Sequence, residues 1–210
     1  MNAKKAREKA VRAAKEALIL DAAITVFSEK GYHESRLEDI AEKAGFSKAS
    51  LYNYFSDKEE IFLTLAVREY GKVIEASRKA IDPQKSFAEN LRQNLLIIFT
   101  LFGEHFAFML TTTNYQTMSL LHIEIEKHKH LFSKFQKHLT DVQGILQKLI
   151  DIGRKRKEIA SSLEDASLSR FIGSLIRGML FRWKLEGKMG NITVAADEIV
   201  EFVTHGATAS

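Results

Sequence analysis

The stretch LEDIAEKAGFSKASLYNYF, residues 37–55, decides the fold of the first part of this chain. Apolar residues recur at helical spacing in its first half, Gly45 interrupts the pattern, and Ser47 can cap a second short helix. Ala41 is small where the two helices must cross, and a glycine takes the positive φ of a tight turn without strain. This spacing predicts a helix-turn-helix motif over residues 36–55.

In a helix-turn-helix unit, the second helix enters the major groove of DNA with its first residues nearest the bases. Ala49 and Ser50 are small enough for close approach, and a methyl or hydroxyl group can contact a base edge. Tyrosine and asparagine offer neutral hydrogen-bonding groups to phosphates, and N–H groups at the start of the next helix favour anions. The residues expected to meet DNA are therefore Lys48, Ala49, Ser50, Tyr52, Asn53, Tyr54 and Lys58.

The longer stretch ILDAAITVFSEKGYHESRLEDIAEKAGFSKASLYNYFSDKEEIFLTL, residues 19–65, closely resembles the DNA-binding domain of the TetR family of bacterial transcriptional regulators. The resemblance rests on AA..VF..KGY at the end of the first helix, DIA..AG.S at the turn, LY.YF in the recognition helix, and DKEE. It implies the same DNA contacts and adds Arg36 to them. Ser47, at the start of the recognition helix, is the last of the residues predicted to bind DNA.

Two residues depart from the pattern common in that family. Arg36 stands where threonine or serine is frequent, and Glu38 where a basic or polar residue often lies. Arg36 could contact a phosphate or a guanine. Glu38 could accept a hydrogen bond from a cytosine N4, but its S-x-x-E spacing from Ser35 favours the acid of a helix capping box.

The charge of the chain is unevenly distributed. The net charge is +4, but residues 1–15 carry +5, residues 16–60 carry −5, and residues 61–210 carry +4. The basic extension over 1–15 could continue the first helix toward DNA phosphates, form an arm in the minor groove, or be a solvated, frayed terminus. These alternatives stay open on the sequence alone.

Apolar residues recur at helical spacing along nearly the whole chain, without the strict alternation of strands, so the fold class is all-α. We expect an N-terminal three-helix helix-turn-helix DNA-binding domain and a larger C-terminal helical domain. The expected segments are a basic extension at 1–15, a DNA-binding domain at 16–80, and an effector-binding and dimerisation domain at 81–210.

Cap signals predict several helix boundaries. Gly31 follows a first helix expected over about 5–29. The S-x-x-E pairs Ser35/Glu38 and Ser56/Glu59 each predict a capping box, and Asp82-Pro83 predicts the start of a helix over about 84–102. Later helices are expected near 104–112, 115–125, 127–153, 163–185 and 193–205.

The family resemblance implies a homodimer whose last helices form a four-helix bundle. Two C-terminal helices this apolar favour a partner surface over an ordinary core. The predicted dimer residues are Phe171, Leu175, Ile176, Met179, Ile199, Phe202 and Val203.

The resemblance also implies an effector site in the larger domain. The middle of the chain is rich in aromatic and methionine residues with a polar interlude near residue 113, which suits an apolar cavity with few polar anchors. We expect a small lipophilic or aromatic effector. The predicted pocket residues are Phe99, Phe102, Phe106, Met109, Tyr115, Met118, Phe135 and Phe181.

Several other classes are disfavoured. The absence of cysteine excludes disulfide frameworks and thiolate zinc sites. His122, Glu126 and His130 would share one helix face, but flanking lysines favour a solvated stripe, so no metal site is expected. No Ser/His/Asp set, phosphate-binding glycine loop or pair of carboxylates stands out, so no cofactor or enzymatic activity is expected. The apolar stretch 93–103 has about half the roughly 20 residues that span a bilayer, and no signal peptide is evident, which predicts a cytoplasmic protein.

These patterns together predict a transcriptional regulator, specifically a ligand-responsive repressor. It would bind a palindromic operator as a dimer and be released by its effector. The alternative is an architectural or protein-interaction factor that keeps the DNA-binding domain but has no small-molecule effector.

Overall fold

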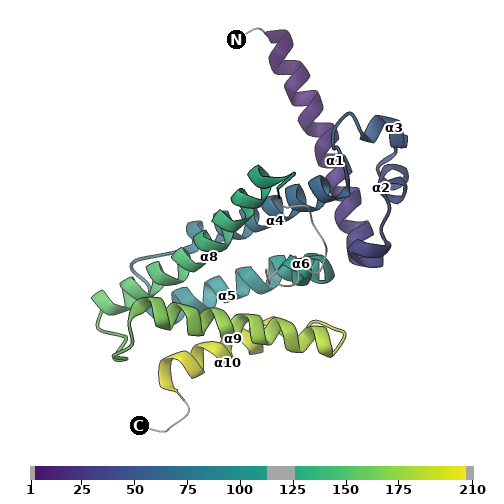
Figure 1. Cartoon of the computed structure of the whole chain (residues 1–210). Coiled ribbons are helices and arrows are strands. Elements are labelled where there is room, and N and C mark those ends of the chain that lie inside the picture. The colour runs from purple at the N-terminus through teal and green to yellow at the C-terminus, as the bar shows by residue number, and fades with distance from the viewer. Residues whose placement is uncertain (1–2, 113–125, 207–210) are drawn as a thin grey trace. The chain divides into compact units, whose positions relative to one another are not determined.

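The structure, a computed structural model, describes residues 3–112 and 126–206, and every regular element in these ranges is an α-helix (Figure 1). The all-α expectation is confirmed. The helices are α1 (Ala3–Glu34), α2 (Leu37–Ala44), α3 (Lys48–Leu51), α4 (Lys58–Ala80), α5 (Phe87–Glu104), α6 (Phe106–Thr112), α8 (Lys129–Lys155), α9 (Asp165–Leu185) and α10 (Ile192–His205). The helix expected over 115–125 lies outside the described residues.

The chain divides into two compact units. The first unit comprises the described residues of 1–68 and 107–134, and the second those of 69–106 and 135–210. Both α4 and α8 are single helices that begin in the first unit and end in the second.

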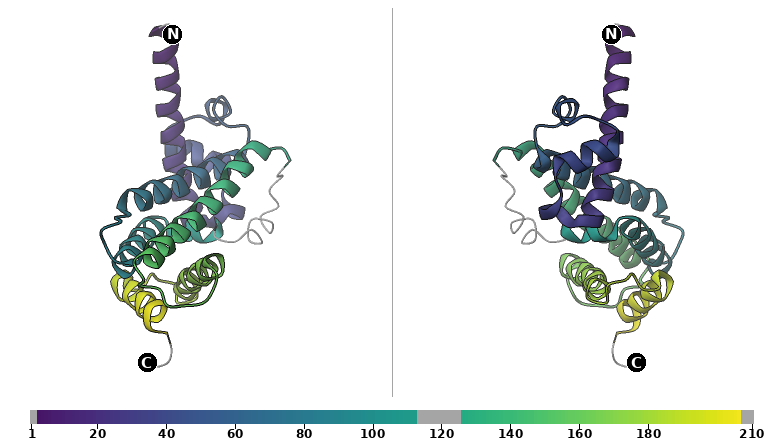
Figure 2. Two further views of the ribbon diagram at one scale, coloured as in Figure 1. Left: turned by 90° about the vertical axis from the view of Figure 1, so that its left-hand side faces the viewer. Right: turned by 90° about the vertical axis from the view of Figure 1, so that its right-hand side faces the viewer.

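In the first unit, α1 has two different halves. Its second half buries one face from Ile19 onward, with Ala23, Ile24 and Phe27 in the core. Residues 3–18 are exposed apart from a half-buried Glu16, so the first half projects beyond the core as a helical extension (Figure 2). The cause is compositional, because basic residues and alanines replace the apolar stripe there.

The helix-turn-helix motif forms where the sequence predicts it. Ile40 and Ala41 bury one face of α2. Gly45 then adopts the left-handed conformation (φ 75°, ψ 28°), its N–H donates to Glu42 O at 3.0 Å, and α2 ends. Leu51 is fully buried on the far side of the turn, so α3 is fixed by packing although it is short.

The two capping boxes predicted in this unit are each displaced by one residue, so the predicted Ser35/Glu38 and Ser56/Glu59 pairings are wrong. At α2, the carboxylate of Asp39 accepts a hydrogen bond from Arg36 N at 3.0 Å. The Ser35 hydroxyl instead donates to Gly31 O and is buried. Both segments carry two adjacent acidic residues, so spacing alone does not decide which one caps the helix.

The same displacement occurs at the start of α4. Asp57 Oδ1 accepts from Glu60 N at 2.7 Å and acts as the cap. Glu60 Oε2 reaches back to accept from Ser56 N at 2.7 Å. An ionised aspartate is a stronger acceptor than the neighbouring serine for the positive end of the helix dipole.

The boundary predicted at Asp82-Pro83 is also wrong in register. These residues form a turn in which Asp82 Oδ1 accepts from Gln84 N at 2.9 Å. α5 begins at Phe87, after a full capping box in which Ser86 Oγ accepts from Glu89 N and Glu89 Oε2 accepts from Ser86 N, at 3.2 and 2.8 Å.

The second unit is held together by an aromatic core. Tyr70 packs edge-on against Phe102 and Phe135, with ring centroids 5.9 and 5.3 Å apart, and Phe99 packs in the same way against Trp183 at 5.1 Å. α10 lies along α5, where Arg92 and Asp197 form an ion pair at 2.6 Å. These contacts join the end of α4 to α5, α8, α9 and α10.

No single helix in the described part of the chain is long and apolar enough to cross a membrane. Only α5 and α6 taken together, across the break at His105, reach the required length and composition. The inner residues of α5 are buried in the core of the second unit.

We expect Gly45→Ala to lower the free energy of unfolding by about 1–2 kcal/mol, because alanine is strained at this positive φ. No atom lies within 4 Å of the added Cβ, so the cost is that of the backbone alone. Gly144→Ala is the matched control: it lies inside α8 with equally open space, and should stabilise by about 1 kcal/mol. Chemical denaturation of both variants tests this, and equal effects would contradict it.

Candidate nucleic-acid interface

The recognition segment consists of α3 and the turn that follows it. Ser47 Oγ accepts from Ser50 N at 3.1 Å and caps α3. After Leu51 the chain tightens, because Asn53 N donates to Ser50 O and Tyr54 N to Leu51 O. The helix expected to about residue 54 is thus a four-residue α-helix that continues as tight turns over 52–54.

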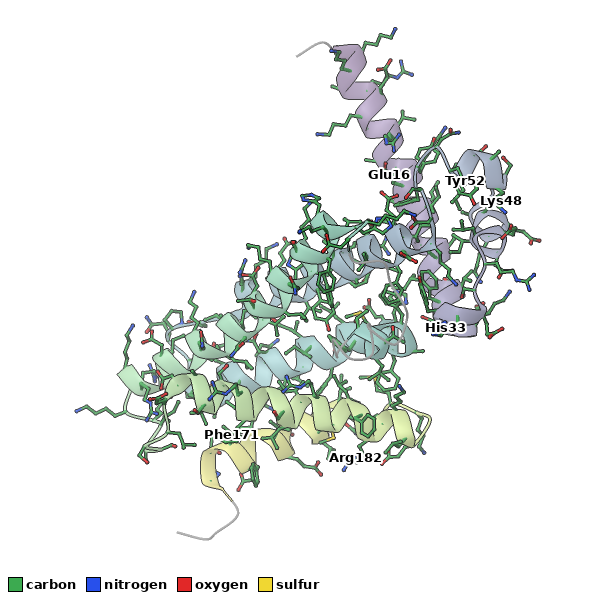
Figure 3. All side chains as sticks on the ribbon, viewed as in Figure 1. Glu16, His33, Lys48, Tyr52, Phe171 and Arg182 are labelled. Carbon is green, nitrogen blue, oxygen red and sulfur yellow. The ribbon has the colours of Figure 1, made fainter. Side chains whose placement is uncertain are left out.

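Most of the residues predicted to contact DNA lie on this segment. Ser50 and Tyr54 are half-buried, and the others are exposed: Ser47, Lys48, Ala49, Tyr52 and Asn53. Figure 3 labels Lys48 at the start of α3 and Tyr52 just after its end. Arg36 is exposed at the start of α2. The structure therefore brings short and polar side chains together on one exposed segment, as recognition of a groove requires.

Lys48 is ion-paired in the free protein. Its ammonium contacts the carboxylate of Glu38 from α2, and both side chains are about half exposed. The hydrogen bond from Lys48 holds the pKa of the Glu38 carboxyl below its usual value, so the pair persists at neutral pH. Glu38 therefore partly neutralises Lys48 and does not take part in a capping box.

Lys58 faces the protein interior and not the recognition surface. Its ammonium donates to the carbonyl oxygens of Tyr32 and Ser35 at 2.7 and 2.9 Å, and lies 4.4 Å from the centre of the Tyr32 ring. Partial burial lowers the pKa of Lys58. The DNA contact predicted for this side chain stays a prediction, and without DNA its ammonium bonds to the carbonyls of Tyr32 and Ser35. The first N–H groups of α4 keep the capacity to meet a phosphate.

An acidic and histidine cluster lies beside the start of α4. Asp57 pairs with Lys127 at 2.7 Å and with His128 at 3.1 Å. Glu59 brings a third possible ligand, and the ligand atoms of Asp57, Glu59 and His128 lie within 4.8 Å of one another. Burial acts to raise the pKa of Asp57, but Lys127 and the Glu60 N–H together hold it below its usual value. These bonds engage the carboxylate as a structural tie.

His122, Glu126 and His130 were predicted to form a solvated helix face that binds no metal, and only part of this set lies among the described residues. His122 lies outside the described residues, whereas Glu126 and His130 are exposed.

The described residues among those predicted for the effector pocket are distributed over both units. Phe99, Phe102 and Phe135 are buried in the second unit and Phe106 is half-buried, while the buried Met109 belongs to the first unit. Phe181 is 57% exposed on α9, so it does not line the interior of this chain. Tyr115 and Met118 lie outside the described residues.

The residues predicted for the dimer interface differ in how far they are buried within this chain. Ile176 and Ile199 are buried within the second unit and Leu175, Met179 and Val203 are half-buried, whereas Phe171 and Phe202 are 58% and 51% exposed. Phe181, Leu185 and Val194 add further exposed apolar side chains on α9 and α10 (Figure 3 labels Phe171). These two helices therefore carry apolar surface that this chain leaves uncovered.

Arg12 also supports the recognition segment, a role that the sequence did not predict. Its guanidinium donates to Asn53 O at 3.1 Å and lies 5.3 Å from the centre of the Tyr54 ring. The helical spacing of the extension is visible in the sequence, but which of its basic residues meets the end of α3 depends on the packing angle.

Two short helices, a left-handed glycine turn and an exposed polar recognition segment define a helix-turn-helix DNA-binding protein. The family model for bacterial regulatory proteins of the tetR family matches residues 19–65. Residues 19–65 therefore carry the DNA-binding domain typical of this family of transcriptional regulators.

The chain is also similar to two curated regulators, one over nearly its full length and one over less than half. The chain is 25% identical to the fatty acid metabolism regulator protein of Bacillus subtilis over 188 residues, which cover 90% of this chain and 93% of that protein. It is 39% identical to the transcriptional regulator RutR of Escherichia coli over 93 residues, 42% of this chain and 43% of RutR.

Solved structures share the fold over about nine-tenths of the chain. FadR from Bacillus subtilis in complex with stearoyl-CoA superposes with a TM-score of 0.75 at 23% identity, covering 91% of this chain and 99% of FadR. PfmR from Thermus thermophilus superposes with a TM-score of 0.69 at 24% identity, covering 90% of this chain and 98% of PfmR. The fold therefore extends beyond the matched DNA-binding segment to the second unit.

Lys58→Met should lower the free energy of unfolding by about 1–3 kcal/mol, because the carbonyls that end α1 lose a charged donor. Lys48→Met is the matched control: its exposed ion pair contributes little to stability, so the thermal midpoint should stay at the wild-type value while DNA affinity falls. Thermal unfolding and DNA titration of both variants measure the two effects. Wild-type stability of Lys58→Met would contradict the structural role.

Proposed function

We propose that this regulator is a ligand-responsive repressor that binds a near-palindromic operator as a homodimer and releases it when a lipophilic effector binds. The observation that carries the proposal is the recognition segment, whose exposed residues are small or polar and are held by the buried Leu51 and Phe55. Such a segment can enter a major groove and read base edges, while the tyrosine and asparagine side chains contact phosphates.

The proposed dimer places two recognition segments in successive major grooves. The spacing required is one helical turn of DNA, about 34–36 Å. The uncovered apolar side chains of α9 and α10, led by Phe171 and Phe202, support a two-fold interface there. Such an interface sets the half-site spacing, because its geometry fixes the distance between the two heads.

The proposed effector is a long-chain acyl thioester or a molecule of similar chemistry. Support comes from the relatives: the B. subtilis protein is a fatty acid metabolism regulator, and B. subtilis FadR was solved with stearoyl-CoA. The aromatic core of the second unit, built on Tyr70, Phe99 and Phe135, is the kind of apolar interior that accommodates an acyl chain.

Two unpartnered polar atoms in that core support a ligand with a polar group. Of the four buried side-chain atoms without a hydrogen-bond partner among the described residues, two belong to the fully buried Ser77 and Asn94, namely Ser77 Oγ and Asn94 Oδ1. Both side chains lie about two turns from the Tyr70–Phe102 contact, toward the loop that joins α4 to α5. Leaving such groups unpaired costs about 1–3 kcal/mol each, which a ligand that bonds to them would recover.

The proposed release follows from the continuity of α4. The effector acts in the second unit, where α4 ends. The same helix begins in the first unit, which carries the recognition segment and is called the recognition unit below. A shift of α4 changes the separation of the two heads so that they no longer match one turn of DNA. This requires that the effector bind the shifted state more tightly than the DNA-binding state.

Selection of bound duplexes from a random pool tests the proposal. The purified chain should enrich a sequence with two-fold symmetry, and stearoyl-CoA should lower its retention, whereas CoA alone should not. Enrichment of an asymmetric or unspecific pool would overturn the operator proposal. Undiminished retention across acyl-CoA chain lengths would overturn the effector proposal.

Tyr52→Ala should weaken operator binding at least about tenfold, because the exposed ring and hydroxyl leave the recognition segment. Native mass spectrometry should show an unchanged dimer. Phe202→Glu is the reciprocal control: it should break the dimer and retain weak half-site binding, since the recognition segment is untouched. Loss of the dimer in Tyr52→Ala would contradict the division of roles.

Asn94→Leu should abolish the response to stearoyl-CoA while preserving stability and operator binding, since the substitution removes only an unpartnered acceptor and a bond to Asn90 O within the same helix. Asn90→Leu is the matched control one turn earlier. Asn90 bonds to Asp82 N and Asp82 O at 2.8 Å each, so its loss should lower stability. A wild-type acyl-CoA response in Asn94→Leu would exclude this residue as an anchor.

A further inference from the structure

The first half of α1 is a feature that the family match does not cover. The match begins at residue 19, whereas α1 begins at Ala3. Residues 3–18 carry six basic side chains and two acidic ones. They continue the anchored second half of α1 as one helix, so their positive charge is held on a defined helical extension (Figure 1).

Arg12 joins this extension to the recognition segment. One guanidinium nitrogen donates to Asn53 O at 3.1 Å, another donates to Glu16 Oε1 at 2.7 Å, and the planar group lies against the Tyr54 ring. The carbonyl of Asn53 belongs to the turn that ends α3, where no further helical N–H is available. Arg12 thus holds the end of the recognition segment against α1.

A cleft of about 480 Å³ opens between the two elements. One wall is the end of the recognition segment, with Asn53 and Tyr54, and the other is α1. The residues of α1 that line it recur at helical spacing on one face: Lys4, Arg7, Glu8, Val11 and Arg12. Three of these five are basic and one is acidic, so the cleft favours an anion.

We propose that this cleft binds the sugar-phosphate backbone of the operator duplex, which makes the extension a second DNA-contacting element with Arg12 as its positioning residue. The inference rests on the operator binding proposed above. The first residues of a recognition helix lie nearest the bases, so its end, at Asn53 and Tyr54, lies toward the backbone. The asparagine amide and the tyrosine hydroxyl are phosphate donors, and the basic face of α1 stands opposite them.

Duplex DNA suits this cleft better than an acidic peptide does, because the cleft is built in part from the recognition segment itself. A backbone that runs past Asn53 and Tyr54 reaches Arg7 and Lys4 without leaving the surface used for reading the groove. The exposed part of the helix, about 24 Å long at 1.5 Å per residue, can follow the duplex over several base pairs.

The test compares two pairs of basic residues on the same helix. Lys4→Gln/Arg7→Gln removes two charges from the cleft face, and Lys5→Gln/Lys9→Gln removes two charges from residues outside the cleft lining. All four positions are exposed, so both variants should fold and dimerise. Circular dichroism and native mass spectrometry check the fold and the dimer. The full-length dimer is titrated with the selected operator and with a scrambled duplex at several salt concentrations.

The cleft pair should reduce the slope of log K against log salt by about 1.8 per protomer, at about 0.9 for each lost phosphate contact. Affinity for the operator and for the scrambled duplex should fall by the same factor, because phosphates carry no sequence. The other pair should change the slope by less than half as much. Equal slopes in the two variants, or a wild-type slope in the cleft pair, would overturn the proposal.

Arg12→Lys separates positioning from charge. It keeps the positive charge but lacks the planar fork that lies on Tyr54 and reaches Asn53 O. The ratio of operator to scrambled affinity should fall severalfold, with the salt slope unchanged. An unchanged ratio would show that Arg12 does not position the recognition segment.

The two levels of proposal fail in different ways. If the wild-type chain enriches no symmetric sequence from a random pool, the proposed operator binding fails. If it enriches one and the cleft pair keeps the wild-type slope, only the role of the cleft fails.

Discussion

The ammonium group of Lys58 is the contact on which the recognition unit depends most. The last carbonyl oxygens of α1 have no helical partner, and Lys58, from the first turn of α4, donates to that of Tyr32 and to the carbonyl of Ser35 just after the helix. The end of one long helix and the start of another are therefore held together. The segment between them comprises α2, the turn and α3. Its two ends are held close together by Lys58, which restricts how these helices can be arranged.

This closure explains how so short a recognition helix keeps its orientation. Four helical residues cannot form a stable helix alone, so α3 relies on the burial of Leu51 and Phe55 and on Arg12 at its end. Because these buried side chains fix the helix on its inner face, the exposed side chains need not contribute to its stability and can be small or polar. The net charge of −5 over residues 16–60 is consistent with this arrangement. The polar side chains of the recognition segment and the basic extension take the place of a generally positive surface.

Local patterns predicted the helices and the turn but not which neighbouring residue acts. Gly45 was predictable because the left-handed turn needs glycine. The capping boxes were displaced by one residue because Glu38-Asp39 and Glu59-Glu60 offer two acids at nearly the same spacing. The roles of Lys58 and Arg12 depend on carbonyls distant in the sequence, and the exposure of Phe181 depends on how α9 is rotated in its unit. None of these is encoded in spacing.

The position of Lys58 also bears on how an effector signal would reach DNA. If α4 began in a loosely attached loop, a shift produced in the second unit would be absorbed there. Its first turn is instead bonded to the end of α1 by Lys58, and its cap Asp57 is paired with Lys127 and His128 near the start of α8. A displacement of α4 must then either break several hydrogen bonds or carry the recognition unit with it. Because each bond to a charged group contributes about 1.5–3 kcal/mol, carrying the unit is the less costly response. The contacts that hold the recognition unit together are thus the ones that would couple it to the second unit, with no separate pathway required.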